Sequence, residues 1–272
     1  MAVFGRAGKI AKAMAACAAF AGMLGLAAAE PAHATTVDDI LSKKKLQVGV
    51  LTDFPPFGGT DAEQKPDGYD ADVARLMAKY LGVELELVPV TGPNRIPYLL
   101  TNKIDVLIAT FGITPERAKQ VQFSIPYSSL EIYLVAPKKL AIKGPDDLKG
   151  VKIAVARAST QDTAITAIAP KDAKIMRFDD DASAVQAMLS GQTDALGAAN
   201  VVLAQLTKSN PELELEPKIT LRHQPNGIAL RRADTDLRQW VNTFIFYIRN
   251  NGELDAIHKK WFGVPLPELS SF

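Results

Sequence analysis

The sequence is poor in the residues that carry thiol and imidazole chemistry. Its 272 residues include one cysteine, three histidines and two tryptophans. The cysteine, Cys17, lies close to the N-terminus, so the rest of the chain can form neither a disulfide framework nor a thiol nucleophile. No cluster of cysteine, histidine or carboxylate residues has the spacing of a metal site. We therefore expect no metal and no cofactor.

An excess of charge of one sign is also missing. The formal net charge is +1, with 47% hydrophobic and 22% charged residues. This balance is typical of a soluble globular protein and gives no reason to expect nucleic acid or an anionic membrane surface as a partner. The length is sufficient for two domains of ordinary size.

Long hydrophobic runs are absent beyond the N-terminal segment, residues 1–34, which has the pattern of a secretory signal peptide. Three basic residues precede an alanine-rich run from Ala13 to Ala29, and Ala32-His33-Ala34 is a small-x-small cleavage motif. We expect export and cleavage after Ala34. The run is shorter than the roughly 20 residues that a spanning helix needs, and the stretch before Cys17 is too short to favour lipid attachment there.

The most informative stretch runs from Lys103 to Ser124. The apolar run Asp105–Thr110 is typical of a strand buried on both faces, and Phe111-Gly112 ends it. Thr114 then occupies the N-cap position of a helix that carries Arg117 on its first turn. A helix N-terminus with a guanidinium at the end of a strand predicts a carboxylate site. The alternative is a capped helix whose Arg117 makes a surface ion pair.

Two further strand ends carry candidate ligand groups in the first part of the chain. A strand over 46–52 runs into the Pro- and Gly-rich loop 53–59, where Phe54 and Phe57 either line a ligand site or fill the core. Arg95 follows a strand over 83–90 and opens a short helix over 97–100. It is a second anion-binding candidate, with an ordinary surface charge as the alternative.

The pattern restarts after residue 150. A strand over 151–156 leads into a polar turn where Ser159 or Thr160 can cap a helix that runs to about Ile168. Asn200 follows a short strand over 194–196 and offers amide donors and an acceptor. Two such sets of strands and helices predict two α/β lobes that face each other. Further strands are expected over 132–136, 174–178 and 226–230, and further helices over 73–81, 182–189, 237–248 and 254–261.

Together these residues resemble family 3 of the extracellular solute-binding proteins, the amino-acid receptors of ATP-driven importers. The resemblance covers residues 37–266. It rests on Phe54-Pro55-Pro56-Phe57, Gly68-Tyr69-Asp70-Ala71-Asp72, Asn94-Arg95-Ile96-Pro97, Ile113-Thr114-Pro115-Glu116-Arg117, Phe123-Ser124-Ile125-Pro126-Tyr127, and Asn251-Gly252 with Lys260-Trp261-Phe262-Gly263.

The resemblance implies the two-lobed periplasmic-binding-protein fold of type II, with a mostly parallel sheet in each lobe. Lobe 1 would comprise 37–127 with 227–272, lobe 2 would comprise 131–222, and the hinge would lie near 127–131 and 222–226. It also implies a monomeric periplasmic receptor without enzymatic activity. Such a receptor binds a polar or acidic amino acid, or a related carboxylate, and delivers it to the permease of an ABC transporter.

The resemblance further implies the roles of individual residues. Arg117 would clamp the α-carboxylate of the ligand, and Arg95 would reach a side-chain carboxylate or amide. Phe54 and Phe111 would line the site, while Thr110 and Gly112 would supply backbone groups. Ser159 and Thr160 would add donors from the other lobe.

The sequence departs from the family pattern where the ammonium of the ligand is held. Ala199 replaces the usual aspartate, Gly112 a threonine or serine, and Ala158 a glycine. Because an unpaired buried ammonium is costly, Asn200, Asp53 or Glu131 must serve as acceptor, or the ligand is not an ordinary α-amino acid.

Two other functions remain possible. Periplasmic dehydratases that act on prephenate or arogenate share this fold and need a general acid or base in the cleft, for which Glu131 is the best carboxylate. His223 and His258 are expected to be surface or structural residues. The third possibility is a detached sensor domain, which would need a separate signalling partner.

Overall fold

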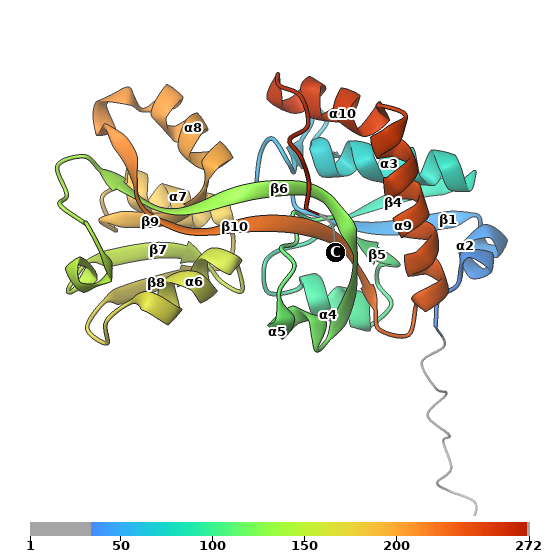
Figure 1. Ribbon diagram of the computed structural model, residues 1–272, viewed down its shortest axis with the longest axis horizontal. Helices are drawn as coiled ribbons and strands as arrows, with labels where there is room; N and C mark the ends of the chain where they lie inside the picture. The colour runs from blue at the N-terminus through green and yellow to red at the C-terminus, as the bar shows by residue number, and fades with distance from the viewer. Residues whose placement is uncertain (1–33, 271–272) are drawn as a thin grey trace, which may run out of the picture. The chain divides into compact units, whose positions relative to one another are not determined.

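The computed structural model describes residues 34–270, which fold into an α/β structure with helices flanking a mixed sheet (Figure 1). The predicted signal peptide lies outside the described residues except for Ala34. Between residues 34 and 270, no helix combines the length and the apolar character needed to cross a membrane.

The strands are β1 (Lys45–Val50), β2 (Gly59–Thr60), β3 (Pro66–Asp67), β4 (Glu84–Pro89), β5 (Val106–Leu107), β6 (Val121–Pro137), β7 (Lys152–Ala156), β8 (Lys174–Phe178), β9 (Ala195–Ala199) and β10 (Leu215–Arg231). The helices are α2 (Val37–Lys43), α3 (Tyr69–Leu81), α4 (Arg95–Leu100), α5 (Pro115–Ala118), α6 (Thr160–Ile168), α7 (Asp181–Leu189), α8 (Asn200–Ser209), α9 (Thr235–Asn250) and α10 (Glu253–Phe262), with short 3₁₀ turns at Pro145–Leu148 and Pro211–Leu213.

The main sheet has the strand order β4-β1-β5-β10-β6-β9-β7-β8. Strands β4, β1 and β5 are parallel and form what we call the first half, together with α2 to α5, α9 and α10 (Figure 1). Strands β9, β7 and β8 are also parallel and form the second half, together with α6 to α8. The long strands β6 and β10 pair antiparallel between the two halves. The carboxyl ends of the parallel strands of both halves supply loops to the region between them.

The extent of β6 and β10 differs from the sequence prediction. The expected strands over 132–136 and 226–230 are parts of two strands of 17 residues each. Each long strand hydrogen-bonds to the other along its length, so polar and proline residues near 126–129 and 223–226 do not end it. The two predicted sheets are therefore joined in one sheet.

Helix signals in the sequence were mostly reliable. Thr114 caps α5 with Pro115 in the first turn, and Gly82 ends α3 in the left-handed conformation with φ 68°. The pattern missed α2 and α8. The N-cap of α8, Ala199, makes no side-chain hydrogen bond to the helix, so no capping residue marked its start.

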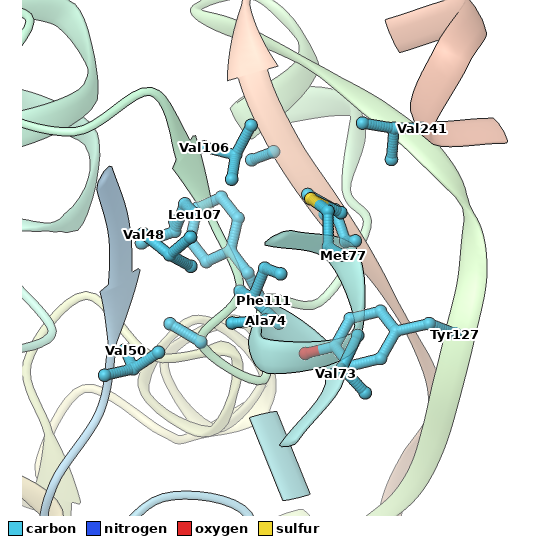
Figure 2. Packing of buried hydrophobic residues seen from close by; sticks show 14 of the residues in the cluster. Val48, Val50, Val73, Ala74, Met77, Val106, Leu107, Phe111, Tyr127 and Val241 are labelled. Atoms are coloured by element: carbon cyan, nitrogen blue, oxygen red, sulfur yellow. The ribbon is translucent and has the colours of Figure 1, made fainter. Parts of the chain in front are cut away.

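One large apolar core fills the first half. Buried valines of β1 and β5 face α3, where Val73, Ala74 and Met77 are fully buried (Figure 2). Apolar residues of α9 belong to the same core, and Tyr80 of α3 packs against Phe244 of α9 with ring centres 5.8 Å apart. Burial of this kind contributes about 25 cal/mol per Å² of apolar surface and is the main source of the stability of the first half.

The second half has two smaller apolar clusters, one on each side of the sheet. One contains Val135, Leu196 and Leu206, and the other contains Leu134, Val155 and Ile165. Because successive strand residues point to opposite faces, the neighbours Leu134 and Val135 lie in different clusters.

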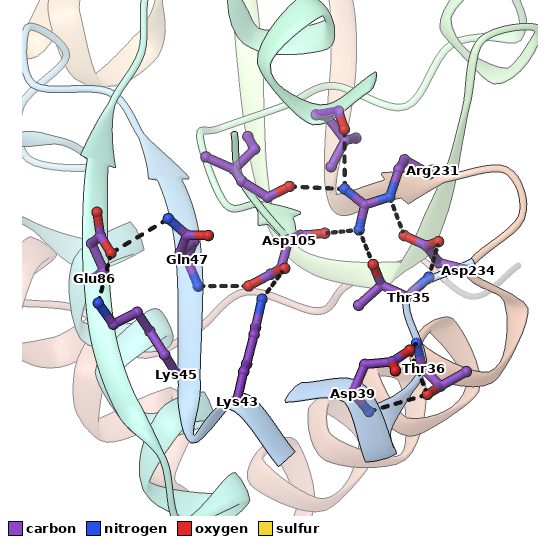
Figure 3. A network of polar contacts seen from close by, with 12 residues as sticks. Thr35, Thr36, Asp39, Lys43, Lys45, Gln47, Glu86, Asp105, Arg231 and Asp234 are labelled. Carbon is purple, nitrogen blue, oxygen red and sulfur yellow. Dashed lines mark hydrogen bonds and ion pairs between the residues drawn. The ribbon is translucent and has the colours of Figure 1, made fainter. Parts of the chain in front are cut away.

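A buried polar network ties distant parts of the first half together (Figure 3). Arg231 donates to the carbonyl oxygens of Leu99 and Ile104 at 3.0 and 2.9 Å and pairs with Asp234 at 2.9 Å. Asp105 accepts from the backbone N–H of Gln47 at 2.8 Å. The end of β10 is thus attached to the start of β5 and to β1.

Candidate functional site

A narrow pocket lies between the two halves. The first half supplies Leu51, Phe54, Arg95, Thr110 and Arg117 to its lining. The second half contributes Ser159, Thr160, Gln161 and Asp181, and the long strands contribute Leu130, Ile132 and Gln224. This lining contains two guanidiniums and a carboxylate, which are groups that can bind a small charged molecule.

Arg117 reaches across the space between the halves. From α5 its guanidinium donates to the carbonyl oxygen of Gly112 at 2.8 Å and to that of Ala158, in the second half, at 3.0 Å. The guanidinium carbon lies 4.0 Å from the centre of the Phe111 ring. Among residues 34–270, Arg117 forms no ion pair with a carboxylate.

Arg95 lies beside Arg117 and is only 6% exposed. It donates to the carbonyl oxygens of Ala109 at 3.2 Å and Ala158 at 3.4 Å, and its guanidinium lies 4.9 Å from the Phe111 ring. Its partners within the described residues are likewise carbonyl oxygens rather than carboxylates.

The electrostatics of this pair are unfavourable without an anion. Burial lowers the pKa of Arg95. Burial, followed by the charges of Arg95 and Arg222, lowers the pKa of Arg117 well below its ordinary value. Buried charges are normally paired. Two neighbouring guanidiniums that share a carbonyl oxygen are therefore suited to receive one or two carboxylate groups.

A buried network below the pocket holds Thr110 in place. Thr110 has φ 47°, in the left-handed region that branched side chains rarely adopt. Its hydroxyl donates to Asp70 at 2.8 Å, and its N–H donates to the Tyr127 hydroxyl at 3.2 Å. That hydroxyl donates in turn to Asp70 at 2.7 Å. Burial raises the pKa of Asp70 to about 7, despite these two donors.

Gly112 is required by a side chain from the opposite strand. A Cβ atom at this position would lie 2.6 Å from the Gln224 side chain. Gln224 accepts a hydrogen bond from the Thr160 hydroxyl and donates to Asn226 at 2.7 Å. The amide of Gln224 thus takes the space beside Gly112 and links β10 to the second half.

The turn of the second half has the predicted helix start. Ser159 caps α6 and accepts from the N–H of Asp162 at 3.0 Å. Ala158, before it, has φ 60°, which explains why glycine would suit this position. Both Ser159 and Thr160 line the pocket.

Not every residue predicted for the site lies in the pocket lining. The structure places Phe54, Arg95, Thr110, Arg117, Ser159 and Thr160 there, with Phe111 under the guanidiniums and Gly112 bonded to Arg117. Asn200 instead lines a separate groove beside α10, and its side chain accepts from the N–H of Glu131. Glu131 in turn contacts His223 at 2.7 Å.

The two loop aromatics have different positions. Phe54 lies at the pocket, whereas Phe57 is 1% exposed and packs against Tyr69 and Phe262 with ring centres 5.3 and 4.9 Å away. The sequence left open whether each ring lines a ligand site or fills the core. In the structure Phe54 does the first and Phe57 the second.

Sequence reasoning missed Asp181, Gln161 and Gln224. Asp181 lies in a run of three aspartates at a helix start, a signal that is read as capping. The N–H of Asp181 donates to Asp53 at 2.8 Å, which places Asp53 behind Asp181. Burial and the charge of Asp53 raise the pKa of Asp181 to about 7, against the effect of Arg95. Burial also raises the pKa of Asp53.

No group of three or more histidine, cysteine, aspartate or glutamate residues within 34–270 is placed to hold a metal ion. The charged groups of the pocket are those of arginine and aspartate side chains.

Comparison with known proteins places the chain among solute receptors. Residues 46–264 match the bacterial extracellular solute-binding proteins, family 3. The glutamine-binding protein GlnH of an ABC transporter from Bacillus subtilis is 34% identical over 231 residues, which are 83% of this chain and 84% of that protein.

Solved structures agree in fold. A mutant of ArgBP from T. maritima has a TM-score of 0.78 and 34% identity and covers 85% of this chain and 100% of that one. The ancestral amino acid-binding protein AncCDT-1, described as a precursor of cyclohexadienyl dehydratase, has a TM-score of 0.76 and 37% identity and covers 84% of this chain and 100% of that one. The predicted type II periplasmic-binding-protein fold is confirmed.

Proposed function

This chain belongs to family 3 of the bacterial extracellular solute-binding proteins, and from that premise we propose that it is the periplasmic receptor of an ABC importer for a polar or acidic amino acid or a related small carboxylate. The ligand binds in the pocket between the halves, and the receptor delivers it to the permease. It acts as a monomer and does not change the ligand chemically.

The observation that carries this proposal is the pair Arg95 and Arg117. Both guanidiniums face the pocket, and both have only carbonyl acceptors among residues 34–270. Arg117 binds the α-carboxylate, because it contacts Ala158 more closely than Arg95 does, and Ser159 and Thr160 next to Ala158 line the pocket. Arg95 binds a second carboxylate or an amide on the ligand side chain.

Ligand binding changes the positions of the two halves. Residues 37–127 with 227–272 form one lobe and residues 131–222 the other. The crossings near 127–131 and 222–226 act as the hinge, since β6 and β10 there form the connection through the main sheet. The closed form presents a surface to the permease that the open form lacks.

A thermal-shift screen of L-amino acids and small carboxylates tests the proposal. A ligand at a hundred times its Kd adds about 2.7 kcal/mol to the free energy of unfolding. We expect a shift with one or a few polar or acidic amino acids. If no amino acid or carboxylate stabilises the protein, the proposed function is wrong.

One observation favours a dehydratase as the second candidate. Asp181 lines the pocket, and with a pKa of about 7 it can hold a proton at neutral pH, as a general acid must. The two arginines match the two carboxylates of prephenate. Incubation with prephenate or arogenate and measurement of the aromatic product tests this activity. Turnover that Asp181→Asn abolishes would favour the enzyme, and no turnover would exclude it.

A further inference from the structure

Asp181 contributes a carboxylate to the pocket without a partner of its own. It is the first residue of α7, and its side chain is half-buried in the lining. Its backbone N–H donates to Asp53, but its carboxylate makes no hydrogen bond or ion pair with any residue between 34 and 270. A carboxylate that lines a pocket and has no partner there can accept hydrogen bonds from a ligand.

The charges around Asp181 leave a negative excess at this end of the pocket. Asp53, from the loop after β1, and Asp180, the N-cap of α7, both repel it, and Arg95 of α4 attracts it. Arg95 is also the partner of Ala109 and Ala158 and makes no ion pair with Asp181. A cation placed against Asp181 would favour its ionised form.

Within the described residues, the pocket lining contains no other carboxylate. Ala199 is fully buried and carries a methyl group. The side chain of Asn200 bonds to the N–H of Glu131 and lies in the separate groove, and Glu131 contacts His223. Among the lining residues, Asp181 is the carboxylate that remains.

We propose that Asp181 binds the cationic group of the ligand and thereby selects ligands that carry one in addition to their carboxylates. This inference rests on the proposed function. Two guanidiniums and one carboxylate in the lining complement a molecule with two anionic groups and one cationic group. The ligand class is therefore an α-amino acid with an acidic side chain, and its α-ammonium lies against Asp181.

Calorimetry with matched pairs of probes tests this role. L-Glutamate and glutarate share two carboxylates and differ in the ammonium, and L-arginine and 5-guanidinopentanoate differ in the same way. Asp181→Asn replaces an ionised acceptor with a neutral amide and leaves the ammonium without a counter-charge, so the Kd of L-glutamate should rise about 10- to 100-fold. The Kd of glutarate should stay within about threefold of the parent value.

Asp179→Asn is the control, because this neighbouring aspartate is 78% exposed and pairs with Arg157 outside the pocket. Asp179→Asn should leave the Kd of every probe unchanged. L-Arginine and 5-guanidinopentanoate identify the cation: if both lose affinity in Asp181→Asn, Asp181 binds the guanidinium of the side chain, and if only L-arginine does, it binds the ammonium. The second result supports the assignment of the ammonium to Asp181, and the first contradicts it.

Proton release gives a second measurement. At pH 6 the carboxyl group of Asp181 must lose a proton when the cation binds, so the heat of binding should depend on the ionisation heat of the buffer in the parent and not in Asp181→Asn. If Asp181→Asn weakens L-glutamate no more than Asp179→Asn does, or weakens glutarate equally, this inference is wrong while the receptor function stands. If the parent binds none of these probes, this inference is wrong, and the receptor function depends on the thermal-shift screen alone.

Discussion

The two sides of the pocket are built differently. On the first half, Arg95, Thr110 and Arg117 rest on the large apolar core and on the buried bonds among Asp70, Tyr127 and Thr110. On the second half, Ser159, Thr160 and Asp181 stand at the N-termini of two short helices over smaller apolar clusters. The first side presents two guanidiniums over a large apolar core, and the second side presents hydroxyls and a carboxylate over smaller apolar clusters.

This difference assigns separate tasks to the two sides. Preorganised charge on a rigid support contributes binding energy, because little order has to be created when the ligand arrives. The two halves already touch in the structure, since Ala158 of the second half accepts hydrogen bonds from both Arg95 and Arg117. We infer that the first half sets the affinity for carboxylates and that the second half selects among them.

The largest expected effect is at Arg117. Arg117→Lys keeps a positive charge but cannot make two parallel hydrogen bonds to a carboxylate. Loss of one partner of a desolvated pair costs on the order of 2–5 kcal/mol of binding, which corresponds to roughly 30- to several-thousand-fold in Kd. Calorimetry should show a smaller loss for Arg95→Lys, mainly with acidic or amide ligands.

Arg249→Lys, on α9 and away from the pocket, serves as the control for Arg117→Lys. The melting temperatures of all three variants should stay close to that of the parent. An Arg117→Lys protein that binds within threefold of the parent would show that this arginine does not clamp the carboxylate.

The buried network of Asp70, Thr110 and Tyr127 below the first side should affect the pH dependence of the free energy of unfolding. Burial raises the pKa of Asp70 to about 7 in the folded state, above its unfolded value of 3.8. The folded state therefore binds more protons between these values, and the stability from Asp70 is present at low pH and falls as the pH rises towards 7. Asp70→Asn lacks this dependence, so the parent should lose stability relative to it by up to about 1.4 kcal/mol per pH unit.

Urea unfolding from pH 4 to pH 8 measures this difference. Asp146→Asn, an exposed substitution in the second half, should give a curve parallel to that of the parent. A difference in the free energy of unfolding between Asp70→Asn and the parent that stays constant over this range would mean that Asp70 is ionised throughout.

The contact between the first side and β10 should appear as coupling between Gly112 and Gln224. Gly112→Ala places a Cβ 2.6 Å from the Gln224 side chain and should destabilise the protein by about 1–2 kcal/mol, as overpacking does. Gln224→Ser removes the obstacle, so the double variant should recover most of that loss. If the stability changes of the two single variants simply add in the double variant, the Gln224 side chain moves away from the new Cβ without cost.

The smallest expected effect is on the second side. Ser159→Ala removes the N-cap of α6 and should cost about 1 kcal/mol of stability. Ser183→Ala, at an exposed position of α7, should cost less. Equal losses for the two in chemical unfolding would indicate that the hydrogen bond from Asp162 to Ser159 adds nothing.

The same contrast explains what the sequence could predict. Thr114, Pro115 and Arg117 lie close together in the chain, so a local pattern predicted the capped helix that carries Arg117. Asp181 and Gln224 reach the pocket only through the packing of α7 and β10, and no local pattern marks that packing. The length of β6 and β10 was underestimated for a related reason, since each strand is completed by its partner almost 100 residues away.

The missing ammonium partner shows the limit most clearly. Comparison by position reported Ala199 as a gap in the site, and the acceptors chosen to fill it were those nearest a strand end. The structure brings a carboxylate from another segment into the same pocket. A carboxylate that is absent at one position of the sequence can therefore be present in the pocket from another position.

A distance between the two halves tests the central claim, that an amino acid is held between them, most directly. From Thr35 onward the chain has no cysteine, so Glu116→Cys on α5 and Ala167→Cys on α6, both exposed, can carry a pair of spin labels. We expect a broad distribution without ligand and a shorter, narrower one with the amino acid found in the screen, and no such change in Arg117→Lys. The same distribution with and without saturating ligand would contradict the account.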